Sequence, residues 1–324
     1  MTQQKHRKAL IRARMARTGE AYTAARRHVV EQDRPPSLTL LGAFRAHDRH
    51  CMTAVFTPDD RQLISGGFGG QARIWGLDGT LAAELVGHES SVNAVCVSPD
   101  GTLAVTASSD QTVRSWDLAT GQQRALLGWH KRQVLGLAFD EARGRAWSGG
   151  HDGKLAAWDV ATGEEAGRID VGGSVTSVAV RDDGTLPAST VGGGVTVRDA
   201  DGAEVARLAA DTHASTSVTW AGDGSFLMAA ASGEALVWSS DDWEVVRRIP
   251  PGGEGLWPVA LSADGSRIAL GWHEHVGLWG ADEEGPVVTV DGLPRGVYGL
   301  AFSHDGTRLA MAAADGRVRL WEVS

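Results

Sequence analysis

Long apolar runs are missing from this 324-residue sequence, and cysteines are few. It contains no stretch of about 18 or more apolar residues that could span a membrane, and its N-terminus lacks the continuous apolar core of a secretory signal. The two cysteines, Cys51 and Cys96, are too few for a disulfide framework and fall inside strand-like patterns, where a small buried thiol packs well. We therefore expect a soluble protein of a reducing, cytoplasmic compartment.

Compact enzyme motifs are missing too. The sequence has no P-loop, no dinucleotide-binding glycine motif, no HExxH zinc motif, no GxSxG nucleophile motif and no pair of CxxC motifs. These absences leave a dispersed active site open, but they favour a protein that is not an enzyme. We expect no catalytic residues, no metal and no cofactor.

Proline and tyrosine are scarce, with 10 and 2 residues, whereas glycine and tryptophan are abundant, with 42 and 12. Many glycines with few prolines indicate tight turns rather than disorder. The hydrophobic content of 42% is enough for a buried core. This composition favours a turn-rich, all-β protein.

Lysine provides only four of the 31 basic residues, which is typical of a GC-rich genome and suggests a bacterial, actinobacterial source. The charge is also uneven along the chain. Residues 1–34 contain nine basic and three acidic residues, so this segment carries +6 and the remainder −15, for a total of −9. The sequence therefore predicts a basic arm on an acidic body.

One structural unit recurs along the chain. In residues 92–117 an apolar alternation leads to the turn Ser98-Pro99-Asp100-Gly101, and a second alternation, a polar turn and a strand ending in tryptophan follow. Alternation with short turns is the pattern of β-hairpins. The last position of the unit recurs at spacings of 40 to 42 residues, at Trp75, Trp116, Trp158, Arg198, Trp238, Trp279 and Trp321.

A period of this length predicts four-stranded sheets arranged as propeller blades. One such sheet exposes both of its faces, and only stacking in a closed ring buries them. We therefore expect an all-β fold, a seven-bladed β-propeller of four-stranded antiparallel blades, with a short α-helical N-terminal extension.

Polar residues at fixed positions make the repeats similar to those of the WD-repeat family. In that family a His, a Ser or Thr, an Asp and the Trp of one repeat form a buried hydrogen-bond network. Repeats 2 and 3 have all four residues at identical spacings of 18, 4 and 6, whereas repeat 1 has Gly69 in place of the Asp. The resemblance implies a structural network of His47, Ser65, Trp75, His88, Thr106, Asp110, Trp116, His130, Ser148, Asp152 and Trp158. A His/Ser/Asp set also suits a hydrolase, but the intervening Trp favours a scaffold role.

The seventh repeat lacks an outer strand of its own, because the sequence ends three residues after Trp321. Residues 37–44 are strand-like and stand where an outer strand precedes the other repeats. We expect them to complete blade 7, as the resemblance implies, and to remove an exposed sheet edge. The predicted domains are a basic helical segment, residues 1–34, and a propeller, residues 37–324.

The basic segment fits two short helices, over residues 5–18 and 20–30, with Gly19 between them and Pro35 and Pro36 after them. Three roles stay open for it: binding another protein, contacting nucleic acid or anionic lipid, or folding onto the acidic body of its own chain. The weak apolar stripe and the scarcity of aromatic residues argue against lipid and nucleic acid.

The resemblance also implies a binding face, formed by the loops before each first strand and the turns before each third strand. The expected partner-binding residues are His50, Met52, Phe68, Asn93, Arg132, Leu135, His151, Trp257, Trp272, His273, Arg295 and Tyr298. Trp257, Trp272 and Tyr298 should lie beside one another, and such side chains often anchor interfaces. An alternative for Trp257 is packing between blades.

Two functions follow from these residues. The first is a non-catalytic scaffold that binds a protein or peptide on the loop face and is monomeric by itself. The alternative is a propeller enzyme with a small-molecule or metal site at the channel mouth. His273 and His275 could share a metal ion, although no third ligand can be assigned.

Overall fold

The structure is a computed structural model that describes residues 37–181, 187–191, 194–199, 201–209, 215–221, 224–231, 234–250, 258–280, 285–293 and 296–324. The basic segment, residues 1–34, lies outside the described residues.

The described strands form seven four-stranded antiparallel sheets. We number them as blades in chain order. Blade 1 contains β2 (Cys51–Phe56), β3 (Gln62–Gly67), β4 (Gln71–Gly76) and β5 (Leu81–Val86). Blade 2 contains β6 (Val92–Val97), β7 (Leu103–Ser108), β8 (Thr112–Asp117) and β9 (Gln123–Trp129). Blade 3 contains β10 (Val134–Asp140), β11 (Arg145–Gly150), β12 (Lys154–Asp159) and β13 (Glu165–Asp170).

The second half of the chain continues in the same way. Blade 4 contains β14 (Val175–Val180), β15 (Pro187–Val191), β16 (Gly194–Arg198) and β17 (Glu204–Ala209). Blade 5 contains β18 (Ser215–Trp220), β19 (Phe226–Ala231), β20 (Glu234–Ser239) and β21 (Val245–Ile249). Blade 6 contains β22 (Val259–Leu261), β23 (Arg267–Trp272), β24 (His275–Gly280) and β25 (Val288–Val290). Blade 7 contains β26 (Val297–Phe302), β27 (Arg308–Ala313), β28 (Arg317–Val323) and β1 (Leu38–Arg45).

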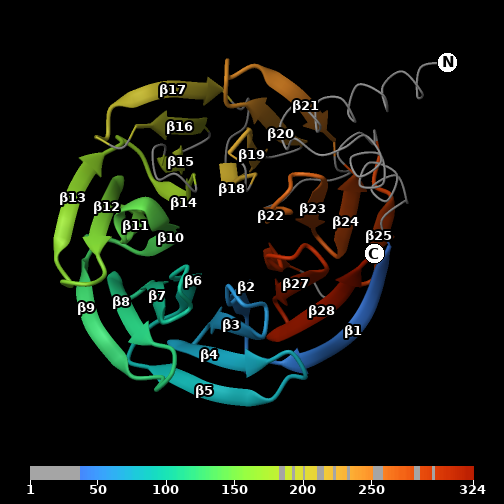
Figure 1. Cartoon of the computed structure of the whole chain (residues 1–324), viewed down its shortest axis with the longest axis horizontal. Helices are drawn as coiled ribbons and strands as arrows, with labels where there is room; N and C mark the ends of the chain where they lie inside the picture. Colours follow the sequence, from blue (N-terminus) through green and yellow to red (C-terminus); the bar gives the residue numbers. More distant parts are fainter. Residues whose placement is uncertain are drawn as a thin grey trace, which may run out of the picture.

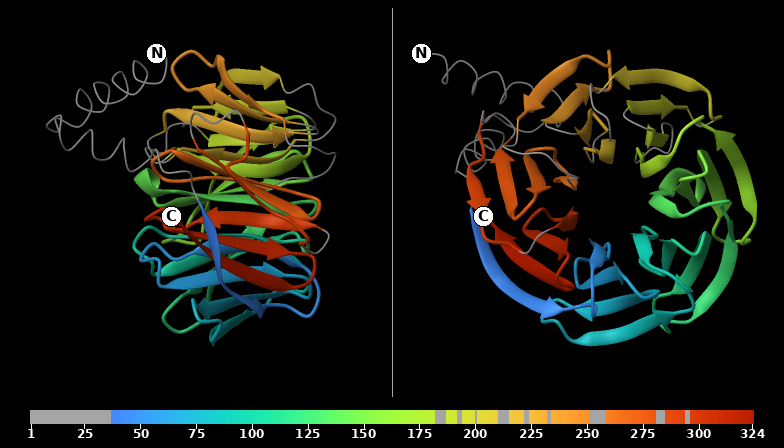
Figure 2. Two further views of the ribbon diagram at one scale, coloured as in Figure 1. Left: turned by 90° about the vertical axis from the view of Figure 1, so that its right-hand side faces the viewer. Right: turned by 180° about the vertical axis from the view of Figure 1, so that it is seen from behind.

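The blades stand around a central axis, each with its first strand innermost (Figure 1). Neighbouring inner strands contact one another all the way round, and β2 and β26 close the ring. Seen from the side, the molecule is a disc with loops on its two faces (Figure 2).

The hydrophobic core is divided into layers between adjacent blades. Between blades 1 and 2, for example, Ile64 and Ile74 pack against Val92 and Trp116. The same arrangement recurs around the ring, and Ala54 and Leu63 of blade 1 pack against β27 and β28 residues where the ring closes. Because each layer needs both of its blades, no sheet buries its apolar faces alone.

The N-terminal strand closes the ring, as the sequence predicts. Strand β1 pairs antiparallel with β28, from Leu38 opposite Val323 to Arg45 opposite Arg317. Phe44 then packs on Trp75 of blade 1, with ring centroids 5.0 Å apart. One strand therefore completes blade 7 and fastens it to blade 1.

The expected fold needs correction in its helical part. The only helical element of the described residues is a 3-10 turn, Glu141–Arg143, and the described chain contains no α-helix. The structure therefore does not support an α-helical N-terminal extension as part of this fold, since the segment expected to form it lies outside the described residues.

Candidate protein-interaction face

Blades 2 and 3 contain the four-residue polar network. In blade 2 the Trp116 indole donates to the Thr106 hydroxyl (2.7 Å), which contacts His88 Nε2 (2.7 Å), and His88 Nδ1 contacts Asp110 (2.8 Å). Blade 3 repeats the arrangement with Trp158, Ser148, His130 and Asp152, at 2.7, 2.8 and 3.0 Å.

These networks are structural. Burial lowers the pKa of His88, against the opposing effect of Asp110, so the imidazole is neutral near pH 7. Each Asp also accepts a hydrogen bond from the backbone amide of the residue after the His, Glu89 in blade 2 and Lys131 in blade 3. The networks therefore tie the loop before the first strand to the turn between the second and third strands.

In blade 1 the network stops at the imidazole. Trp75 donates to Ser65 (2.9 Å), and Ser65 contacts His47 Nε2 (2.8 Å), but Nδ1 of this buried imidazole has no hydrogen-bond partner among the described residues. The residue at the Asp position is Gly69. Burial, with a smaller contribution from Arg73, lowers the pKa of His47 to about 4.

Blades 4 to 7 replace the network. The position of the Ser or Thr, two residues after the partner of the Trp in the strand pairing, is taken by the buried apolar residues Ala229, Leu270 and Met311 in blades 5, 6 and 7. In blade 4 the buried Arg198 stands in place of Trp and binds Glu204 at 3.0 Å. These blades are held by apolar packing and ion pairs instead.

A β-bulge displaces one residue near the start of several inner strands. Met52, Asn93, Leu135 and Tyr298 are each skipped in the pairing between the first and second strands of their blades. All four are among the expected partner-binding residues. A bulge re-aims the displaced side chain, so it turns these residues away from the regular alternation of the sheet.

Three rings meet on the loop face where blade 7 joins blade 1. His50, in the loop before β2, makes edge-to-face contacts with Phe68, in the β3–β4 turn (5.9 Å), and with Tyr298, in β26 (5.6 Å). Arg49 lies over Phe68, with Cζ 5.4 Å from the ring centroid. We call Arg49, His50, Phe68 and Tyr298 the aromatic patch.

The aromatic patch is both fixed and accessible. His50 Nδ1 donates to the carbonyl oxygen of Ala314 in blade 7 at 2.8 Å, which holds the imidazole across the blade junction. Phe68 is 45% exposed and Tyr298 37% exposed. Exposed rings held in place by neighbours lose little side-chain entropy when they bind a partner.

Trp272, expected beside Trp257 and Tyr298 on the binding face, is instead a buried residue. Trp272 is only 9% exposed and packs against Trp279 and His275. The reason is a shorter turn: Trp272 pairs with His275, so two residues connect these strands. Three residues connect β3, which ends at Gly67, and β4, which begins at Gln71. Trp272 is thus a strand residue, unlike Phe68.

The other expected residues are spread around the ring. Arg132, His151 and His273 are exposed, and Leu135 is half-buried. The Asn93 side chain donates to the carbonyl oxygen of Val134 (2.8 Å) and so joins blades 2 and 3. Trp257 and Arg295 lie outside the described residues. Among the expected residues that the structure describes, ring contacts join His50, Phe68 and Tyr298, with the adjacent Arg49, which the repeat alignment did not select.

The WD40 family model, described as WD domain, G-beta repeat, matches residues 38–76, 79–117 and 285–322. These segments contain strands β1 to β8 and β25 to β28, and thus the four-residue network of blade 2. The chain therefore contains WD repeats. Proteins of this family are typically protein-interaction scaffolds and generally not catalytic.

Several curated proteins resemble part of this WD-repeat chain. The guanine nucleotide-binding protein subunit beta of Oryza sativa subsp. japonica is 30% identical over 159 residues, 44% of this chain and 42% of that protein. Ribosome biogenesis protein YTM1 of Candida albicans is 30% identical over 121 residues, covering 33% and 26%. Transducin-like enhancer protein 2 of Mus musculus is 25% identical over 134 residues, covering 40% and 18%. The chain thus spans less than half the length of each relative.

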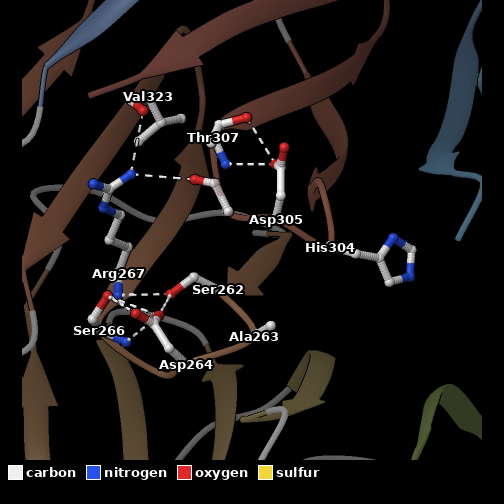
Figure 3. A pocket seen from close by; sticks show the side chains of 10 residues that line it. Ser262, Ala263, Asp264, Ser266, Arg267, His304, Asp305, Thr307 and Val323 are labelled. Atoms are coloured by element: carbon white, nitrogen blue, oxygen red, sulfur yellow. Dashed lines mark hydrogen bonds between the residues drawn. The ribbon is translucent and has the colours of Figure 1, made fainter. Parts of the chain in front are cut away.

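A polar groove of about 440 Å³ lies at the opposite face of the WD-repeat propeller, where the inner strands of blades 6 and 7 end (Figure 3). Its acids are engaged in their own turns: Asp264 accepts from Ser262, and Asp305 accepts from Ser303. The same Ser-x-Asp turn occurs in blade 2, at Ser98 and Asp100. These side chains therefore stabilise turns.

The described residues hold no group of three or more His, Cys, Asp or Glu side chains placed to bind a metal ion. His275 instead contacts Asp291 at 2.7 Å and stacks on Trp272. Among the described residues, no helix is long and apolar enough to cross a membrane.

Proposed function

We propose that this WD-repeat propeller binds a protein or peptide on its loop face, with the aromatic patch at the junction of blades 7 and 1 as the central contact. The observation that carries this proposal is the patch itself: two exposed rings held edge-to-face by one imidazole, with a guanidinium above Phe68. Tyr, Trp and Arg side chains dominate the energy of protein interfaces, and exposed rings are the usual anchors.

Two further features support the proposal. Other residues of the same face, Arg132 and His151, are exposed polar side chains and suit the rim of an interface. One similar protein is named as a subunit of a guanine nucleotide-binding protein, and a subunit by definition contacts other chains. The partner's identity stays open.

Affinity capture from the native organism, followed by mass spectrometry, tests the proposal. The full-length protein is compared with the double variant Phe68→Ala/Tyr298→Ala and with Trp129→Ala as a matched control. Trp129 is 62% exposed and is the last residue of β9, the outer strand of blade 2, whereas the patch lies at the junction of blades 7 and 1. Proteins captured by the wild type and by Trp129→Ala should be lost from the double variant, while all three melt at the same temperature.

Equal capture by the double variant would contradict the proposal. A lower melting temperature of that variant would instead place the two rings in the structural core. Both readouts are therefore needed from the same preparations.

The two-part organisation also belongs to this proposal: a basic segment, residues 1–34, that makes a second protein contact, and a propeller, residues 37–324, that is monomeric by itself. Binding of the segment to nucleic acid or anionic lipid would appear as salt-sensitive association that is lost when residues 1–34 are removed. The bacterial source and the cytoplasmic compartment stay predictions.

A further inference from the structure

The buried imidazole of His47 presents one hydrogen-bonding atom that its blade does not use. His47 is 1% exposed, and its Nδ1 has no partner among the described residues. In blades 2 and 3 the equivalent Nδ1 atoms contact the carboxylates of Asp110 and Asp152. Blade 1 has Gly69 at that position and so supplies no carboxylate.

The equivalent networks of blades 2 and 3 assign the proton of the His47 imidazole to this atom. The Trp75 indole can only donate, so Ser65 Oγ accepts from it. In blades 2 and 3 Nδ1 faces a carboxylate, which can only accept, so Nε2 accepts from the hydroxyl; by the same arrangement Ser65 Oγ donates to His47 Nε2. Burial keeps the pKa of His47 at about 4, so the imidazole is neutral near pH 7 and carries its single proton on Nδ1. Nδ1–H is therefore a donor that requires an acceptor.

One backbone contact beside His47 is the same as in the blades that hold a carboxylate. The Phe68 amide donates to the His50 carbonyl oxygen at 2.9 Å, as Ser109 does to Ser91 and His151 to Gln133. The blade 1 turn therefore makes the same contact with its loop as the turns of blades 2 and 3, although Gly69 has a φ of +113° and Asp110 and Asp152 have no positive φ. By this equivalence the amide of Asp48 is the second donor, in the place of Glu89 and Lys131, which donate to the Asp carboxylates at 3.0 and 2.8 Å.

The position above Gly69 is open to solvent. Gly69 is exposed, and a side chain built on it would meet nothing nearer than the end of Gln71, at 4.0 Å. The charges nearby are mixed: Arg73 makes the potential at His47 more positive, and the exposed Asp48 makes it more negative. Arg49 adds a further cation beside the turn, over Phe68.

From this geometry we propose that the blade 1 turn receives a carboxylate of the bound protein between His47 Nδ1–H and the Asp48 amide. The incoming group takes the place that Asp110 and Asp152 fill in their own blades. Because Gly69 directly follows Phe68, the carboxylate would enter beside the aromatic patch, and the inference rests on the proposed function of that patch. The preferred partner segment then has an aromatic-binding part next to an acidic residue or a free C-terminus.

Histidine side-chain NMR of the full-length protein tests the proposal. The Nδ1–H signal of His47, assigned by its loss in His47→Gln, is followed as sodium acetate is added and compared with sodium chloride at equal ionic strength. Acetate should shift the signal saturably towards those of His88 and His130, which are already paired with carboxylates. Chloride should leave it in place.

Two variants of the turn provide the matched control. Gly69→Asp supplies the carboxylate from within the chain, whereas Gly69→Ala adds a side chain without one. Both variants must adopt the same unfavourable backbone conformation, since φ of Gly69 is +113°. Gly69→Asp should shift the His47 signal without any ligand and reduce its response to acetate about tenfold or more, while Gly69→Ala should still respond.

Three peptides separate the sources of the carboxylate. A capped Gly-Gly-Asp-Gly-Gly peptide represents an acidic side chain, its capped Asn counterpart represents neither source, and the Asn peptide with a free C-terminus represents a chain end. A shift with the first or the third supports the proposal and names the source. No shift with acetate or with either of these peptides, an equal shift with the capped Asn peptide, or an undiminished response in Gly69→Asp would overturn it.

Failure of the carboxylate site and failure of the proposed function give different results. If Phe68→Ala/Tyr298→Ala loses its captured partner while His47 does not respond to carboxylates, the binding face stands and only the carboxylate site fails. If His47 responds while capture is unchanged in the double variant, the proposed face fails instead.

Discussion

Ser37 and Ser324, which are 287 positions apart, are hydrogen-bonded to each other through their main chains and through their hydroxyl groups. The amide of each donates to the carbonyl oxygen of the other, at 2.9 and 3.2 Å, and the two Oγ atoms are 2.5 Å apart. This pair begins the ladder between β1 and β28 that completes blade 7. The ring is thus held closed by hydrogen bonds between the two ends of the propeller.

Removing the closing strand should therefore open the ring. A chain of residues 46–324 lacks β1 and leaves β28 as an exposed sheet edge, and it loses the Phe44–Trp75 contact. We expect aggregation or loss of cooperative melting, measured by size-exclusion chromatography and thermal unfolding. A chain lacking only residues 1–34 should behave like the full-length protein. A soluble 46–324 chain that melts cooperatively would contradict the closure.

The polar network of blade 2 should be sensitive to loss of a single hydroxyl. Thr106→Val preserves shape but leaves the Trp116 indole and His88 Nε2 without their shared partner. Unsatisfied buried groups of this kind cost about 1–3 kcal/mol each in unfolding free energy. Thr102→Val, in an exposed turn, is the control and should cost less than about 1 kcal/mol. Equal shifts of the two denaturation midpoints would argue against the network.

Stability should fall as the pH falls below about 6.5. The folded-state pKa of His47 is lowered to about 4 from a usual value of 6.5, because burial and Arg73 disfavour the charged imidazole. Between these values the unfolded chain binds more protons than the folded chain, so the contribution of His47 is complete above pH 6.5 and is lost towards pH 4. Its size is roughly 3 kcal/mol.

The variant His47→Gln isolates this effect, since glutamine does not titrate. Urea unfolding at pH 7, 5.5 and 4.5 should give a shallower pH dependence for His47→Gln than for the wild type. Parallel curves for the two proteins would show that His47 titrates normally when folded.

Tryptophan 272 and tyrosine 298 should respond differently to truncation. Trp272 is 9% exposed and lies in the core shared by blades 5 and 6, so Trp272→Ala should destabilise the protein by about 3–5 kcal/mol. Tyr298 is 37% exposed, and Tyr298→Ala should change the unfolding free energy by less than about 1 kcal/mol. Chemical denaturation of both variants checks this, and the reverse order would contradict the assignment of core and rim.

The spacing of the tryptophans predicts most of the architecture, because the period is set by the length of a four-stranded sheet. The strand-like residues 37–44 likewise predict the closing strand, since an unpaired edge in blade 7 requires one. The missing Asp at Gly69 predicts the incomplete network of His47. In each of these three cases the residue type and its position in the repeat are enough to predict the structural feature.

The aromatic patch could not be predicted in the same way. Its residues come from blades 1 and 7, and no sequence spacing records which side chains meet across the ring closure. The misplacement of Trp272 has a local cause: the turn after it is one residue shorter than the turn after Gly67, so counting back from Trp279 assigns Trp272 to the turn. The pairing of Trp272 with His275, rather than the spacing to Trp279, assigns Trp272 to the strand.

The most direct measurement of the central claim is site-specific photo-crosslinking in cells of the source organism. A benzophenone amino acid replaces Phe68 in the aromatic patch or, as the control, Trp129 on an outer strand. We predict that the Phe68 position forms a discrete crosslinked product with another protein and that the Trp129 position does not. If Phe68 yields no product, or the same products as Trp129, the aromatic patch is not the partner-binding surface.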